Sequence, residues 1–327
     1  MKRLYPVLAF TCALLPLPGA MAQTTLTSST PVIGFYKFDV PVGTSIWTCG
    51  LVTKKAFQGQ ASSMTSGTNS TLTMNGAAWP TFGLHYVEIL SGAQSGLVLD
   101  ILSNTATTLQ LKGNTASLGL SGTESFCVRS HSTLGSVFQG GAGLNGGTDT
   151  VTLVRDTGRK TYAWNGSGWE DGDLNDAGNT IIYPGQAFLI NNGKGSPSTV
   201  TFGGGEVAYV KSGPIKVPLY RGIPNLVGLV NPLVSTTIGD SNFASSNNLL
   251  GNFGLVSSLS AGNDTVALRQ NNGSLTPAGV YQSNGSNLED GELNDGSNVQ
   301  VRNGVGLIIS VQADRTWTVP SLLPAGQ

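Results

Sequence analysis

Two short acidic segments carry the side chains best suited to holding a metal ion. Their oxygens come from Asp171, Asp173, Asn175 and Asp176, and from Asp290, Glu292, Asn294 and Asp295. Both sets fall at positions i, i+2, i+4 and i+5, a spacing with which a tight loop turns successive oxygens inward, as Ca²⁺ requires. The helix–loop–helix calcium loop needs an acid at its twelfth position, where Ile182 and Val301 stand, so that standard loop is excluded. Two interpretations remain, a looser Ca²⁺ site and a turn capped by side-chain to backbone hydrogen bonds.

Catalytic residues are harder to find. The two histidines, His85 and His131, do not form a zinc-binding spacing, and neither a Gly-x-Ser-x-Gly element nor a phosphate loop is present. Asp171, with Asp173 or Glu170, would supply the paired carboxylates of a glycoside hydrolase. A loop of acids and glycine that occurs twice is more typical of a turn than of an active site, so the sequence predicts a protein that is not an enzyme.

Cysteine usage points to one pair. Cys12 lies in a leader that we expect to be removed, which leaves Cys49 and Cys127. The two cysteines are 78 positions apart in the chain. In the chain-entropy model, a disulfide that closes a loop of this length stabilises the fold by roughly 4 kcal/mol. Two buried free thiols are the alternative, because cysteine is a common small core residue.

The acidic phrase belongs to a longer internal repeat. Residues 170–176 return 119 residues later as 289–295. The other matched segments are 149–153 with 264–268, 165–167 with 284–286, and 185–190 with 304–309. The offset changes from 115 to 119, so the second copy has about four extra residues around 275–279. A repeat of this length predicts two copies of one folding unit.

The repeat also sorts the aromatic residues. Tyr162 is matched by a second tyrosine and Trp169 by a leucine, so both positions need bulk in both copies and are expected in the core. Trp164 is matched by Ser283, so we expect Trp164 to be exposed. An exposed indole on a strand would give a sugar ring a flat surface to stack on.

Short apolar and alternating runs bounded by Gly, Asn, Ser and Thr recur along the chain, and Asn-Gly turns separate them. This pattern predicts an all-β protein with two tandem copies of a β-sandwich or barrel-like unit. The copies share an opening at 32–41 and 207–218, each followed by Gly-Leu-Val at 50–52 and 228–230. We place the first unit at 23–210 and the second unit at 211–327. The first unit contains an insert, 61–129, predicted to be a small β subdomain.

Taken together, these features resemble a group of uncharacterised secreted all-β proteins from bacteria of the verrucomicrobial kind. The resemblance lies in the leader and in segments 31–35, 106–109, 162–169 and 281–288, and it covers almost the whole mature chain. It implies export and a two-copy β architecture. It implies no established activity, and it transfers no catalytic residue.

The N-terminal residues and the charge balance indicate where the protein acts and which partners suit it. Lys2 and Arg3, an apolar run at 4–17 and the small-x-small site at 20–22 predict a signal peptide at 1–22. The protein is therefore expected to be secreted and to lie outside the cell, at the cell surface or in the periplasm. No later run reaches the ~20 apolar residues of a membrane span. With 17 basic and 18 acidic residues and 11% charged in total, nucleic acid and anionic membrane are unsuitable partners, whereas low net charge favours self-association.

The sequence thus predicts a non-catalytic secreted structural or cell-surface protein, such as a self-assembling subunit of a fibre, coat or matrix. An adhesin or glycan-binding module, acting through the insert or Trp164, is the alternative, and a glycoside hydrolase is a remote one. Beyond Ca²⁺ at the acidic loops, no cofactor is expected.

Overall fold

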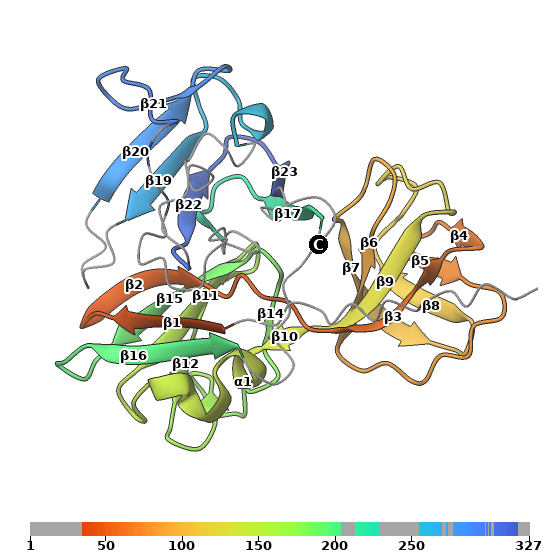
Figure 1. Ribbon diagram of the computed structural model, residues 1–327, viewed down its shortest axis with the longest axis horizontal. Helices are drawn as coiled ribbons and strands as arrows, with labels where there is room; N and C mark the ends of the chain where they lie inside the picture. Colours follow the sequence, from red (N-terminus) through yellow and green to blue (C-terminus); the bar gives the residue numbers. More distant parts are fainter. Residues whose placement is uncertain are drawn as a thin grey trace, which may run out of the picture. The chain divides into compact units, whose positions relative to one another are not determined.

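The computed structural model describes residues 35–203, 213–228, 255–269, 273, 277–297, 299, 301 and 304–319, and these residues form antiparallel sheets joined by turns (Figure 1). The all-β prediction is confirmed. The predicted signal peptide at 1–22 and residues 207–212 of the shared opening at 207–218 lie outside the described residues. Within the part that is described, no helix combines the length and the apolar character needed to cross a bilayer.

The first unit is built on a five-stranded antiparallel sheet. Its strands are, in spatial order, β13 (Trp169–Glu170), β12 (Gly158–Trp164), β11 (Thr150–Arg155), β15 (Ala187–Asn192) and β2 (Gly43–Thr48). A ribbon of β1 (Phe35–Val40) and β16 (Ser198–Gly203) accompanies it, with a pair formed by β10 (Ser132–Thr133) and β14 (Ile181–Ile182). The short helix α1 (Leu134–Val137) and the 3-10 turn η1 (Gln139–Gly143) follow β10. Apolar side chains from these elements share one core, which includes Trp47, Phe138, Phe188 and Phe202.

The second unit has a five-stranded sheet of its own. Its strands are, in spatial order, β18 (Asn225–Val227), β22 (Leu307–Ser310), β19 (Thr265–Arg269), β20 (Pro277–Ser283) and β21 (Leu288–Glu289). A ribbon of β17 (Ile215–Leu219) and β23 (Arg315–Val319) accompanies this sheet, and the 3-10 turn η5 (Val256–Ser258) precedes β19. The segments matched in sequence form β11 and β19, β12 and β20, β13 and β21, and β15 and β22. Each matched pair takes the same place in its own sheet.

The insert forms a separate seven-stranded sheet. In spatial order its strands are β3 (Lys55–Gln60), β9 (Ser125–Ser130), β6 (His85–Ile89), β7 (Val98–Asn104), β8 (Thr108–Lys112), β5 (Asn69–Thr73) and β4 (Ser63–Thr65). Only residues 61 and 62 separate β3 from β4 in the chain, although the two strands stand at opposite ends of this order, so the sheet closes on itself. The sheet spans 55–130, which is longer at both ends than the predicted insert of 61–129.

The two five-stranded sheets meet through reciprocal backbone contacts. Thr48 N donates to Gly304 O at 2.7 Å, and Gly228 N donates to Gly185 O at 2.9 Å. Gly185 and Gly304 are matched residues, so each sheet edge binds the equivalent turn of the other unit. In the registers of β2 and β18, Gly228 takes the position in its sheet that Thr48 takes in the first sheet. This corrects the shared Gly-Leu-Val triplet, which matches Gly228 to residue 50. Buried apolar side chains fill the space between the sheets: Ile46, Ala187, Leu189 and Leu226.

Candidate functional site

Each acidic loop is a tight turn held by its first aspartate. Asp171 Oδ1 accepts the backbone N–H groups of Asp173 and Asn175, both at 2.9 Å. Asp290 Oδ1 accepts from Glu292 and Asn294 at the same 2.9 Å. The Asn175 backbone contact is the main reason that the pKa of Asp171 is lowered, and the Asn294 side chain is the main reason for Asp290. These bonds favour the ionised form of each carboxyl group.

The last aspartate of each loop caps the next turn. Asp176 accepts from Gly178 N at 2.9 Å, and Asp295 accepts from Ser297 N at 2.8 Å. Asp173 and Glu292 are exposed. Across the described ranges, no group of three or more His, Cys, Asp or Glu side chains is arranged to hold a metal ion. Hydrogen-bonded turns account for the spacing of these residues, and the looser Ca²⁺ site stays the second interpretation.

The same loops present a feature that the sequence analysis missed. Leu174 and Leu293 are 76% and 77% exposed, and their backbone φ angles are 63° and 64°. A positive φ strains any residue with a Cβ, and glycine or asparagine relieves that strain. The signal in the sequence is a large apolar residue inside an otherwise polar turn, at matched positions of both copies.

Trp164 is buried, so the prediction that it is exposed is wrong. Its side chain is 7% exposed, and its ring centroid lies 5.7 Å from that of Trp169. The backbone of Gly141 lies against the indole, where an added Cβ would come within 2.5 Å of Trp164 Nε1. Ser283, its match, is fully buried too. The position faces the core in both units, and a sugar has no access to the indole face.

Of the two interpretations of the cysteine pair, the structure has the buried free thiols. Cys49 and Cys127 are buried free thiols rather than a disulfide. Cys49 belongs to the core of the first unit, whereas Cys127 lies in the insert sheet with its Sγ 3.7 Å from Glu88 Oε2. Burial raises the pKa of both thiols to about 11. Thiols of this kind are weak nucleophiles at neutral pH.

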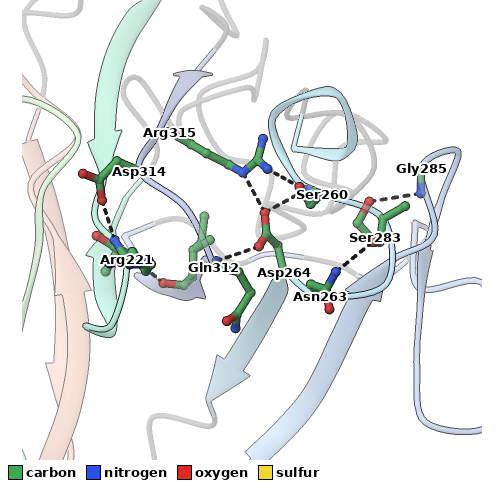
Figure 2. A network of polar contacts seen from close by, with 12 residues as sticks. Arg221, Ser260, Asn263, Asp264, Ser283, Gly285, Gln312, Asp314 and Arg315 are labelled. Carbon is green, nitrogen blue, oxygen red and sulfur yellow. Dashed lines mark hydrogen bonds and ion pairs between the residues drawn. The ribbon is translucent and has the colours of Figure 1, made fainter.

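Two matched aspartates, Asp149 and Asp264, are completely buried. Asp264 accepts from Ser260 N at 2.7 Å and from Gln312 N at 2.9 Å, and Arg315 Nε forms an ion pair with it at 2.9 Å (Figure 2). In the first unit, Asp149 accepts from the backbone N–H groups at the equivalent places, of residue 145 at 2.8 Å and residue 193 at 2.9 Å. Each carboxylate therefore ties the turn before one strand to the end of the neighbouring strand. In the sequence, these buried aspartates can be recognised because an Asp precedes the Thr-Val pair in both copies.

The insert sheet contains a buried ion pair. Arg129 Nε lies 3.0 Å from Glu88 Oε2, and both side chains are almost wholly buried. Arg129 also donates to Thr53 O in the segment before β3. Burial by itself lowers the pKa of Arg129. The charges of Glu88, Cys127 and Tyr86 and the hydrogen bond with Glu88 together outweigh burial, so the pKa is raised. The pair is satisfied internally and ties the sheet to the preceding chain.

A third polar cluster contains the residues closest to a catalytic arrangement. His131 Nε2 lies 3.1 Å from Asp100 Oδ1, and Tyr183 donates to Asp100 Oδ2 at 2.9 Å. Burial raises the pKa of Asp100, but contacts with His131 and Tyr183 and the charge of Lys112 outweigh burial, so the pKa is lowered. His131 is only 4% exposed, which leaves no room for a substrate at the imidazole.

Comparison with protein-family models, curated proteins and solved structures finds no match for this chain. The site must therefore be judged on its geometry. The polar clusters described above are used within the fold, and the exposed chemistry that both units share is concentrated in the two acidic loops.

Proposed function

We propose that this chain is a non-catalytic secreted structural or cell-surface protein that works by contact, and that it assembles with copies of itself into a fibre, coat or matrix. The observation that carries the proposal is the matched pair of exposed leucines. Leu174 and Leu293 stand 76% and 77% exposed on strained backbone at equivalent tips of the two units.

The other matched residues in these loops have roles in the fold. The aspartates cap turns, and Glu170 and Glu289 each accept a hydrogen bond from an asparagine side chain, at 2.6 and 2.5 Å. The leucine side chains lie in solvent, where they add nothing to the core and strain the turn. Strain kept at a surface position points to a role outside the folded molecule.

Two such tips allow one molecule to contact two neighbours, which is the requirement for an extended assembly. The near-neutral chain, with 17 basic and 18 acidic residues, presents little electrostatic repulsion to self-association. Export through the predicted leader would deliver the protein to the place where such an assembly is useful.

The test uses the full mature chain, 23–327, examined by light scattering over a range of concentrations and by electron microscopy. We expect wild-type protein to form oligomers or filaments, and the double variant Leu174→Asn/Leu293→Asn to remain monomeric. Leu102→Asn is the matched control, because Leu102 is 51% exposed but lies in β7 of the insert. A wild-type protein that stays monomeric at all concentrations would rule out self-assembly.

Recognition of a foreign surface is the second candidate, because the same exposed leucines would serve an adhesin. Because Trp164 is buried, it does not offer the aromatic surface that the sequence analysis predicted for glycan stacking. Monodisperse protein that binds a glycan array or a cell surface, with binding lost in the double leucine variant, would favour this candidate over the structural one.

A further inference from the structure

Asparagine followed by glycine recurs along this chain and is chemically labile. Glycine has no Cβ to hinder attack of its backbone nitrogen on the preceding side chain, and asparagine is a thermolabile residue. The chain contains seven such pairs, with the asparagine at 75, 145, 165, 192, 272, 284 and 303. Residues 272 and 303 lie outside the described residues, so the structure allows five pairs to be compared. The five differ in how firmly the asparagine side chain is held.

The two matched turns hold their asparagine in the same way. Asn165 Oδ1 accepts from the N–H groups of residues 167 and 168, both at 2.8 Å, and Asn165 Nδ2 donates to Glu170 at 2.6 Å. Asn284 Oδ1 accepts from the N–H groups of residues 286 and 287, and Asn284 Nδ2 donates to Glu289. Both side chains are therefore fixed at the oxygen and at the nitrogen.

Two further asparagines are also held. Asn145 Nδ2 donates to Asp149 Oδ2 at 3.2 Å and to Ser198 Oγ at 3.3 Å. Asn192 is only 1% exposed, and its Nδ2 donates to the carbonyl groups of residues 40 and 196. A reaction at any of these four side chains would first have to break such bonds.

Asn75 differs from the other four. It is exposed in the turn after β5, and in the described part of the chain its side chain forms no hydrogen bond. Gly76 takes the turn position that requires a positive φ, here 75°, and open space surrounds it. The Gly76 N–H group donates to no acceptor among the described residues. A bond of 3.3 Å from Ala77 N to Met74 O closes the turn. The two groups that must react are thus both accessible.

We propose that Asn75 is a site of spontaneous deamidation in the native protein. The Gly76 nitrogen loses its proton and attacks Cγ of Asn75, so that a new C–N bond closes a succinimide ring. The bond from Cγ to the carboxamide nitrogen breaks, and this nitrogen leaves as ammonia with the proton. Water then adds to one of the two ring carbonyl groups and opens the ring to an aspartyl or isoaspartyl residue. Water is the only co-reactant.

The product places a charge where the insert sheet closes on itself. Asn75 N donates to Ser62 Oγ at 3.0 Å, and Ser62 lies in the link between β3 and β4. Residues 56–87 contain no Asp, Glu, Lys or Arg. Deamidation therefore gives this segment a negative charge that it otherwise lacks, and the isoaspartyl form also lengthens the backbone of the turn. The reaction does not depend on self-assembly.

The test follows wild-type mature chain in mildly alkaline buffer, where the Gly76 nitrogen loses its proton more readily. Peptide mass mapping locates each modified residue. We expect Asn75 to deamidate at least about tenfold faster than Asn165, whose hydrogen bonds must first break. In denaturant the two should react at the same rate, because the fold then holds neither. Asn75→Gln should stop the reaction at this position, since glutamine must form a larger ring, and should leave the rate at Asn165 unchanged.

Equal rates at Asn75 and Asn165 in native protein would overturn the proposal, and so would a faster reaction at Asn145, Asn192 or Asn284. A preference for Asn75 that persists in denaturant would also overturn it, because the neighbouring sequence and not the folded turn would then be the cause. Both measurements use wild-type protein, so they decide the question even if Asn75→Gln does not fold.

Discussion

At the scale of single residues, the two exposed leucines have a measurable effect on the folded state. A left-handed backbone costs an L-residue about 1–2 kcal/mol, and asparagine tolerates that conformation better than leucine. We expect Leu174→Asn and Leu293→Asn each to raise the melting temperature by about 1–2 °C at low protein concentration. Leu102→Asn, at a position of β7 without a positive φ, should lower the melting temperature, because asparagine is disfavoured in strands. A fall in all three variants would show that the leucines stabilise their turns.

The thiols are a second prediction at this scale. Because burial raises the pKa of Cys49 and Cys127 to about 11, native protein should react with a thiol reagent far more slowly than a free thiol does. After denaturation without reductant, two thiols should react in each mature chain. Finding none would mean that the two cysteines are bridged in the isolated protein.

At the scale of elements, the buried aspartates connect the ends of neighbouring strands. Asp264→Ala would leave the N–H groups of Ser260 and Gln312 without their acceptor and Arg315 without its ion-pair partner. We expect a loss of about 3 kcal/mol in the free energy of unfolding, measured in urea. Asp156→Ala removes an exposed carboxylate at the β11–β12 turn and should change stability by less than about 0.5 kcal/mol. Similar losses in both variants would argue against a special role for the buried group.

The acidic turns give a further prediction for elements. Asp171 Oδ1 and Asp290 Oδ1 already accept backbone N–H groups, so an ion would have to break these bonds to use them. The melting temperature should therefore be the same in millimolar Ca²⁺ and in chelator. A rise with Ca²⁺ that is lost in Asp173→Asn/Glu292→Gln would instead establish the looser calcium site.

At the scale of the whole molecule, reciprocal packing of the two five-stranded sheets depends on glycine. A Cβ added at Gly306 would lie 2.5 Å from Ile46 Cγ2 and 2.6 Å from Ala187 Cβ. We expect Gly306→Ala to lower the free energy of unfolding by about 1–3 kcal/mol through overpacking. Gly291→Ala is the control, because open space surrounds that position and its φ is not positive. Unfolding in urea measures both, and an unchanged Gly306→Ala variant would show that the sheets can separate freely.

The fold class could be predicted because strand patterning and Asn-Gly turns are local properties. Tyr162 and Trp169 were also predicted correctly as core residues, since bulk at both matched positions is visible in the sequence. The burial of Trp164 was not predicted, because a tryptophan matched by a serine does not indicate that the position faces the core in both units. The Asp100–His131 contact could not be predicted from the sequence, because the two residues lie in different segments that only the fold brings together.

The sequence by itself determined an all-β chain, the two matched acidic turns and the absence of a standard calcium loop, since these depend on residues close together in the chain. Only the tertiary structure decided which side chains are buried and which distant residues meet. In the structure, Cys49 and Cys127 are unpaired, the Trp164 side chain lies in the core, and His131 contacts Asp100. Burial is a property of the assembled sheets, and no single strand carries the information that specifies it.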